Sequence, residues 1–73
     1  MNTADLAQKL RERYSSAGKG ETALAIHLFG IEFADELAGQ PINEIAELGT
    51  GHVSYGTEIR KGMRLARYVM LKG

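Results

Sequence analysis

A chain of 73 residues, 44% of them hydrophobic, is long enough for one small domain and too apolar for an intrinsically disordered protein. Because cysteine is absent, disulfides and thiolate zinc sites are excluded, and a hydrophobic core has to stabilise the fold, alone or with a partner subunit. The longest uncharged run, residues 22–31, is far shorter than the roughly 20 apolar residues of a membrane span, and the N-terminus has no signal-peptide pattern. We expect a soluble, cytoplasmic protein without membrane contact, folded as one domain over residues 1–73.

The charges are separated along the chain, although the formal net charge is zero. Residues 1–53 contain four Lys/Arg and eight acids, a net charge of −4, whereas residues 54–73 contain five Lys/Arg and one acid, a net charge of +4. Such a separation is typical of a protein that makes an electrostatically directed contact.

The first half of the sequence predicts three helices. Apolar residues at intervals of three and four indicate a helix over 3–17, started by Asn2 or Thr3 as the cap and ended by Gly18 in a left-handed turn. Residues 21–38 are apolar on nearly every face at first, which is typical of a central, buried helix. Gly30 is expected to divide this stretch into helices of about 21–29 and 31–38, the second closed by Gly39.

The second half predicts a short helix and a long one. Pro41 suits the first turn of a helix that ends at Gly49, and a final helix is expected from Ser54, as its cap, to about Met70. Gly62 lies on the apolar side of the final helix, which indicates either a close helix crossing inside the fold or a self-association seam. If the apolar strip near the chain end stays uncovered, we expect a homodimer there.

No alternating strand pattern is present, so the predicted fold class is all-α: a compact bundle of four to five helices containing a helix-turn-helix-like unit at about residues 41–70. The predicted core consists of eight apolar residues: Leu24, Leu28, Phe29, Phe33, Leu37, Ile45, Ile59 and Met63.

Residues 41–70 contain a short helix, a glycine-containing turn and a longer helix with an exposed polar and basic face. This segment resembles the bacterial helix-turn-helix DNA-binding unit. The runs HLFGIEFADEL, NEIAELG and SYGTEIRKG make residues 20–70 as a whole similar to small bacterial helix-turn-helix-like proteins. In such a unit a small residue lets the helices cross, a glycine makes the turn and apolar residues lock the pair. Ala46 supplies the small residue, Gly49 or Gly51 the turn glycine, and Ile45, Val53 and Ile59 the lock. Neither glycine has the common spacing from Ala46, so a longer turn is expected.

The resemblance implies that the chain binds duplex DNA with its final helix. Residues near the start of a recognition helix usually reach base edges, and residues farther along contact phosphates. Tyr55 has two interpretations: its position fits a contact with base edges, and it also fits an aromatic ring packed under the turn. The candidate DNA-binding residues are Ser54, Thr57 and Lys61 for base edges, Arg60 for guanine, and Arg64 and Arg67 for phosphates.

Other interpretations remain open. The basic face can be a solvated helix side on which Arg67 and Lys72 complement the helix dipole. The chain can instead be a helical protein-interaction module, an adaptor or inhibitor, that uses an acidic surface. That surface would consist of Glu32, Asp35, Glu36, Glu44 and Glu47.

The sequence contains no pattern typical of an enzyme, so no catalytic residue is expected. His27 lies in an apolar stretch, where a lone histidine is usually a hydrogen-bonded core or boundary residue. Two histidines without cysteine predict no metal site, and no cofactor is expected. The leading hypothesis is a non-enzymatic transcriptional or phage-type regulator that binds DNA as a homodimer.

Overall fold

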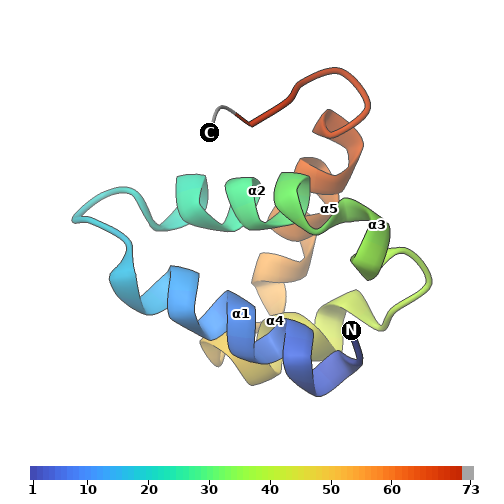
Figure 1. Ribbon diagram of the computed structural model, residues 1–73. Helices are drawn as coiled ribbons and strands as arrows, with labels where there is room; N and C mark the ends of the chain where they lie inside the picture. Colours follow the sequence, from blue (N-terminus) through green and yellow to red (C-terminus); the bar gives the residue numbers. More distant parts are fainter. Residues whose placement is uncertain (72–73) are drawn as a thin grey trace.

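The computed structural model describes residues 1–71, which form helices joined by short turns (Figure 1). No strand occurs among these residues, so the predicted all-α class is confirmed. The elements in chain order are α1 (Thr3–Ser16), α2 (Thr22–Glu32), α3 (Ala34–Leu37), α4 (Ile42–Thr50), the 3₁₀ helix η1 (Val53–Tyr55) and α5 (Gly56–Leu65).

The start of α1 is fixed by a capping box. The Asn2 side chain accepts a hydrogen bond from the Asp5 backbone N–H at 2.8 Å, and the Asp5 carboxylate accepts one from the Asn2 N–H at 3.4 Å. This reciprocal pair satisfies two backbone donors that a helix start leaves unpaired. At the other end the prediction was wrong, because α1 stops at Ser16, Ala17 is extended, and the left-handed glycine of this turn is Gly20 rather than Gly18.

Gly30 does not divide α2, which runs through it to Glu32, so the predicted break was wrong. The glycine is needed for packing instead, since a Cβ added there would lie 2.5 Å from the Ile59 carbonyl oxygen and 3.0 Å from the Gly62 Cα. A Cβ on Gly62 would in turn collide with the His27 carbonyl oxygen. α2 and α5 therefore cross with their backbones in contact, and the predicted helix crossing at Gly62 is confirmed.

The segment between α4 and α5, residues 51–55, lies two residues later in the chain than the predicted turn at Gly49 to Val53. α4 includes Gly49 and Thr50, and Gly51 caps it in the left-handed conformation with φ 83°. Only Gly51 and His52 separate α4 from η1, which leads directly into α5. Gly49 is not a turn glycine, because it lies within α4. It is needed for packing, since a Cβ there would lie 2.8 Å from a methyl group of Leu10 on α1.

The final helix is shorter at both ends than predicted. Ser54 lies in η1 and makes no capping hydrogen bond, so α5 starts at Gly56. α5 ends at Leu65 instead of Met70, because the Arg67 and Tyr68 N–H groups bond to carbonyls three residues back, at 3.2 and 2.9 Å. Such bonds tighten and terminate an α-helix.

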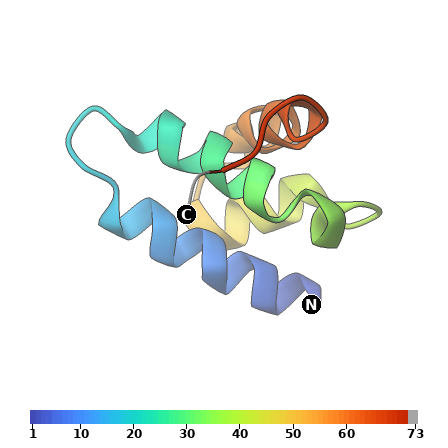
Figure 2. The ribbon, with the colours of Figure 1, turned by 45° about the horizontal axis from the view of Figure 1, so that its top comes forward.

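The core lies between two helix pairs, because α1 packs on α4 and α2 packs on α5 (Figures 1 and 2). Its largest side chains are fully buried: Leu6, Leu10, Ile26, Phe29, Leu37, Ile45 and Ile59. Four predicted core residues, Phe29, Leu37, Ile45 and Ile59, are therefore confirmed, and Phe33 and Met63 are partly buried against the cluster.

Leu24 and Leu28 were wrongly assigned to the core, since their exposed fractions are 49% and 39%. A helix that is apolar on nearly every face carries little information about which side turns inward. In the structure, Ile26, Phe29 and Gly30 form the inward side of α2. No helix within residues 1–71 has the length and apolar character needed to span a membrane.

Candidate nucleic-acid interface

The helix pair α4–α5 has most of the features predicted for a helix-turn-helix unit. Ala46 and Ile45 on α4 are fully buried, as is Ile59 on α5, and Gly51 makes the turn. Val53 was wrongly predicted as part of the lock, because it is 49% exposed.

Tyr55, instead of Val53, packs against the core beside the turn. Its ring lies 5.9 Å from that of Tyr14 on α1, in an edge-to-face arrangement, and 5.9 Å from the His52 ring in the turn. The side chain is half-buried against the core cluster. Tyr55 is thus an aromatic residue packed under the turn, the second of the two interpretations that its position allowed.

The orientation of α5 is fixed from α2 by two contacts of His27. The His27 carbonyl oxygen touches Gly62, and the Nε2 atom of its ring lies 2.9 Å from the Glu58 Oε2 atom. Both side chains are half-buried, so the prediction of a hydrogen-bonded boundary histidine is confirmed. The hydrogen bond from His27 lowers the pKa of Glu58, and Lys61, 3.6 Å away, lowers it further. This anchoring turns the Ile59 and Gly62 side of α5 inward.

The polar residues of α5 occupy the opposite side. At about 100° per residue, Arg60, Arg64, Thr57 and Lys61 follow one another within an arc of about 100°. Arg67 lies in the turn after α5, and Ser54 lies in η1 before it. The structure leaves all six candidate residues exposed: Ser54, Thr57, Arg60, Lys61, Arg64 and Arg67.

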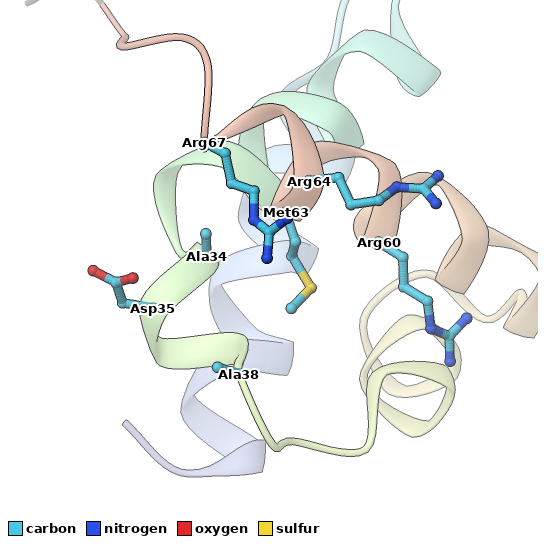
Figure 3. A pocket seen from close by; sticks show the side chains of 7 residues that line it. All are labelled: Ala34, Asp35, Ala38, Arg60, Met63, Arg64 and Arg67. Atoms are coloured by element: carbon cyan, nitrogen blue, oxygen red, sulfur yellow. The ribbon is translucent and has the colours of Figure 1, made fainter.

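Three of the six line one shallow groove, of about 660 Å³, between α3 and α5 (Figure 3). Arg60, Arg64 and Arg67 contribute its basic side, and Met63 contributes apolar surface beside them. The remaining lining residues are Ala34, Asp35 and Ala38. Ser54, Thr57 and Lys61 lie outside the groove.

Comparison with known proteins identifies the family. A family model described as an HTH-like domain matches residues 2–72. The chain belongs to the HTH-like domain family. The predicted resemblance, which began at about residue 20, is confirmed and extends to α1. Searches of curated proteins and of solved structures gave no match.

The charges of the HTH-like domain are not balanced in the groove. Among residues 1–71, no acidic oxygen lies within 4.0 Å of a nitrogen of Arg60, Arg64 or Arg67. Asp35 lines the groove, but its carboxylate points away from the three guanidinium groups in Figure 3. Lys61, in contrast, is paired with Glu58. Lys72, which one interpretation placed beside the helix dipole, is outside the described residues.

The α3 wall of this groove was not predicted. Ala34, Asp35 and Ala38 come about 25 residues before Arg60 in the sequence, and no motif links the two segments. Helical periodicity placed Met63 correctly on the apolar side of α5, but it gave no information about which neighbouring helix leaves that residue half-uncovered.

Proposed function

We propose that this HTH-like domain is a non-enzymatic protein that binds duplex DNA, with η1 and α5 as its reading element, and acts as a transcriptional or phage-type regulator. The observation that carries the proposal is the group of three arginines without acidic partners among residues 1–71, on the exposed side of the second helix of the pair. DNA carries one negative charge per about 1.7 Å of helix axis, so a group of unpaired arginines is attracted to the phosphates of the DNA backbone.

The proposed roles of the residues follow their positions. Arg64 lies near the C-terminal end of α5 and Arg67 in the turn after it, and both suit phosphate contacts, which fix orientation without reading sequence. Arg60 shares their groove and can contact either a phosphate or guanine, for which its guanidinium provides two parallel donors. Ser54 and Thr57, near the N-terminal end, suit base edges. For Lys61 a direct DNA contact requires loosening of its ion pair with Glu58.

The test is the salt dependence of duplex binding by an Arg60→Ala/Arg64→Ala variant. Each lost phosphate contact should reduce the slope of log K against log salt by about 0.9, so the reduction is about 0.9 if only Arg64 contacts a phosphate and about 1.8 if Arg60 does so as well. We expect binding to mixed-sequence duplex at low salt to weaken strongly. Fluorescence anisotropy with a labelled duplex measures both quantities, and circular dichroism confirms the fold.

The matched control is Lys9→Ala/Lys19→Ala, which removes the same charge from exposed or half-exposed positions outside the α4–α5 unit. This variant should keep the wild-type slope and nearly the wild-type affinity. If the arginine variant binds as tightly as wild type at low salt, the proposal is wrong. If both variants weaken equally, the effect is one of net charge and the arginine face is not the site.

A second candidate function is the interaction module with an acidic surface. Glu32 does not contribute freely to that surface, because Arg13 holds both of its carboxylate oxygens, at 2.6 and 3.0 Å, and the hydrogen bond from Arg13 lowers its pKa. The other four, Asp35, Glu36, Glu44 and Glu47, are exposed and have no ion pair within residues 1–71. Passage through heparin at low salt combined with retention on an anion exchanger would favour this candidate.

A further inference from the structure

The outward side of α2 is an apolar stripe that the described chain leaves partly exposed. Leu24 and Leu28 are exposed, by 49% and 39%, and Ile31 continues the stripe as a half-buried residue. The spacing i, i+4, i+7 places the three side chains in one row along two turns of the helix. The opposite side of α2 is already occupied by the core and by α5.

The segment after α5 adds further exposed apolar side chains to those of this stripe. Figures 1 and 2 both show residues 66–71 turning back after α5 toward α2. Seven of the ten large hydrophobic side chains that are exposed within residues 1–71 belong to α2, to the end of α5 or to this segment. We call these seven the apolar face: Leu24, Leu28, Leu65, Tyr68, Val69, Met70 and Leu71. Exposed apolar side chains that gather on one part of a small domain usually mark an interaction site.

The absence of charge over residues 22–31 of α2 argues for a second copy of the same chain as the partner. Residues 22–31 contain no Lys, Arg, Asp or Glu. In a two-fold symmetric interface each residue meets a counterpart of its own surface, so an uncharged stripe can pair with itself without burying like charges. An antiparallel pair of α2 helices centred between His27 and Leu28 brings Leu24 of one copy beside Ile31 of the other.

The size of the face also fits. A stable interface buries about 800 Å² on each partner, roughly one sixth of the 4676 Å² that this chain exposes. The apolar face contains several strongly exposed side chains, including Tyr68 at 80% and Met70 at 91%, which can supply much of that area. A chain of this length buries only about 60% of its unfolded surface by itself, so further burial in a dimer adds stability.

We infer that the apolar face is a homodimer interface, in which α2 packs on α2 of a second copy and the segment after α5 covers the pair. Because α2 packs on the inward side of α5, a partner on the outer side of α2 leaves the groove at Arg60, Arg64 and Arg67 open. The dimer therefore has two basic faces. This inference goes beyond the proposed function and specifies the homodimer expected from the sequence, and its test does not require DNA.

The test compares Leu24→Glu with Leu48→Glu by sedimentation equilibrium. Both leucines are 49% exposed, but Leu48 lies on α4, outside the apolar face, so the pair differs only in location. We expect wild type and Leu48→Glu to dimerise alike. Leu24→Glu, which introduces the carboxylate twice per interface, should weaken dimerisation by at least about 100-fold. A wild-type protein that stays monomeric up to about 1 mM, where even an interaction of about −4 kcal/mol is detected, overturns the inference. Equal dimerisation of all three proteins, or equal loss in both variants, also overturns it.

A cysteine variant tests the geometry without relying on destabilisation. The chain has no cysteine, and the proposed axis passes next to residue 28, so Leu28→Cys should give a disulfide-linked dimer with oxidised glutathione. Leu48→Cys is the control and should stay largely unlinked. Equal linkage of both variants contradicts the interface.

The two proposals fail in distinguishable ways. A monomeric Leu24→Glu domain keeps its arginine groove, so it should still bind DNA with the wild-type salt slope per chain. Loss of dimerisation with retained DNA binding supports both proposals. A dimer that does not bind DNA contradicts only the proposed function.

Discussion

The crossing of α2 and α5 gives a prediction that opposes simple helix propensity. Gly62→Ala replaces a poor helix former with the best one, in the interior of α5, which in an open position stabilises a helix by about 1 kcal/mol. At Gly62 the new methyl group would collide with the His27 carbonyl oxygen and lie 3.0 Å from the Gly30 Cα. Both obstacles are backbone atoms of α2, so neither can rotate away, and the two helices have to separate.

The net effect follows from these opposing terms. Overpacking a tight site costs about 1–3 kcal/mol, and a collision with backbone on a buried crossing belongs near the upper end. After the propensity gain of about 1 kcal/mol is subtracted, Gly62→Ala should lower the free energy of unfolding by about 1–2 kcal/mol. A separation of the helices should also disturb the hydrogen bond between His27 and Glu58, one turn away.

Urea unfolding followed by circular dichroism measures this free energy, and Gly56→Ala is the matched control. Gly56 is also buried in α5, but a Cβ there would meet the Oδ1 atom of Asn43 and lie 3.3 Å from the Nη1 atom of Arg60. These are ends of exposed, rotatable side chains, so Gly56→Ala should stay within about 0.5 kcal/mol of wild type. Equal or greater stability of Gly62→Ala would refute the reasoning that backbone contact fixes this crossing.

Two further predictions concern the polar contacts of the fold. The pKa of Glu58 is lowered by the hydrogen bond from His27, so its stabilising contribution is present above the ordinary glutamate pKa and is lost as the pH falls through the lowered value. Wild type should therefore lose more stability than Glu58→Gln in acid, measured by urea unfolding between about pH 6 and 3, and parallel curves would contradict this origin. Asn2→Ala removes the acceptor for the Asp5 N–H and should cost about 1 kcal/mol in thermal unfolding, whereas an unchanged melting temperature would show that the cap contributes nothing.

Much of the fold could be predicted from the sequence because its helices have local signals. The cap expected at Asn2 or Thr3 acts within the first turn of α1, and the apolar periodicity of residues 3–17 depends on neighbours only three or four residues apart. Gly30 shows the limit of such reasoning. A glycine inside an apolar run is consistent with a break or with a close crossing, and the two differ only in whether another backbone approaches. That approach depends on α5, about 30 residues away in the sequence.

The candidate site, too, could be predicted only in part from the sequence. Periodicity was sufficient to predict that Arg60 and Arg64 share an exposed face, because the anchoring residues Ile59 and Gly62 are on the same helix. It was not sufficient to predict that α3 forms the other wall of the groove, or that Lys61 is partly neutralised by Glu58. Leu24 and Leu28 were misassigned because residues 22–31 lack any polar side that would mark the solvent.

The pairing of the helices also determines when the chain can fold during synthesis. α1 packs on α4, and α2 packs on α5, so each of the first two helices waits for a partner that is synthesised later. The Thr3 hydroxyl donates to the Gln40 side chain, and the Arg11 guanidinium donates to the Leu48 carbonyl, both across 37 residues. Until residues 56–65 leave the ribosome, the side of α2 that carries Gly30 lacks its partner helix, and the side that carries Leu24 is exposed as well. The nascent chain therefore passes through a stage in which its most apolar helix is exposed to water and to other nascent chains.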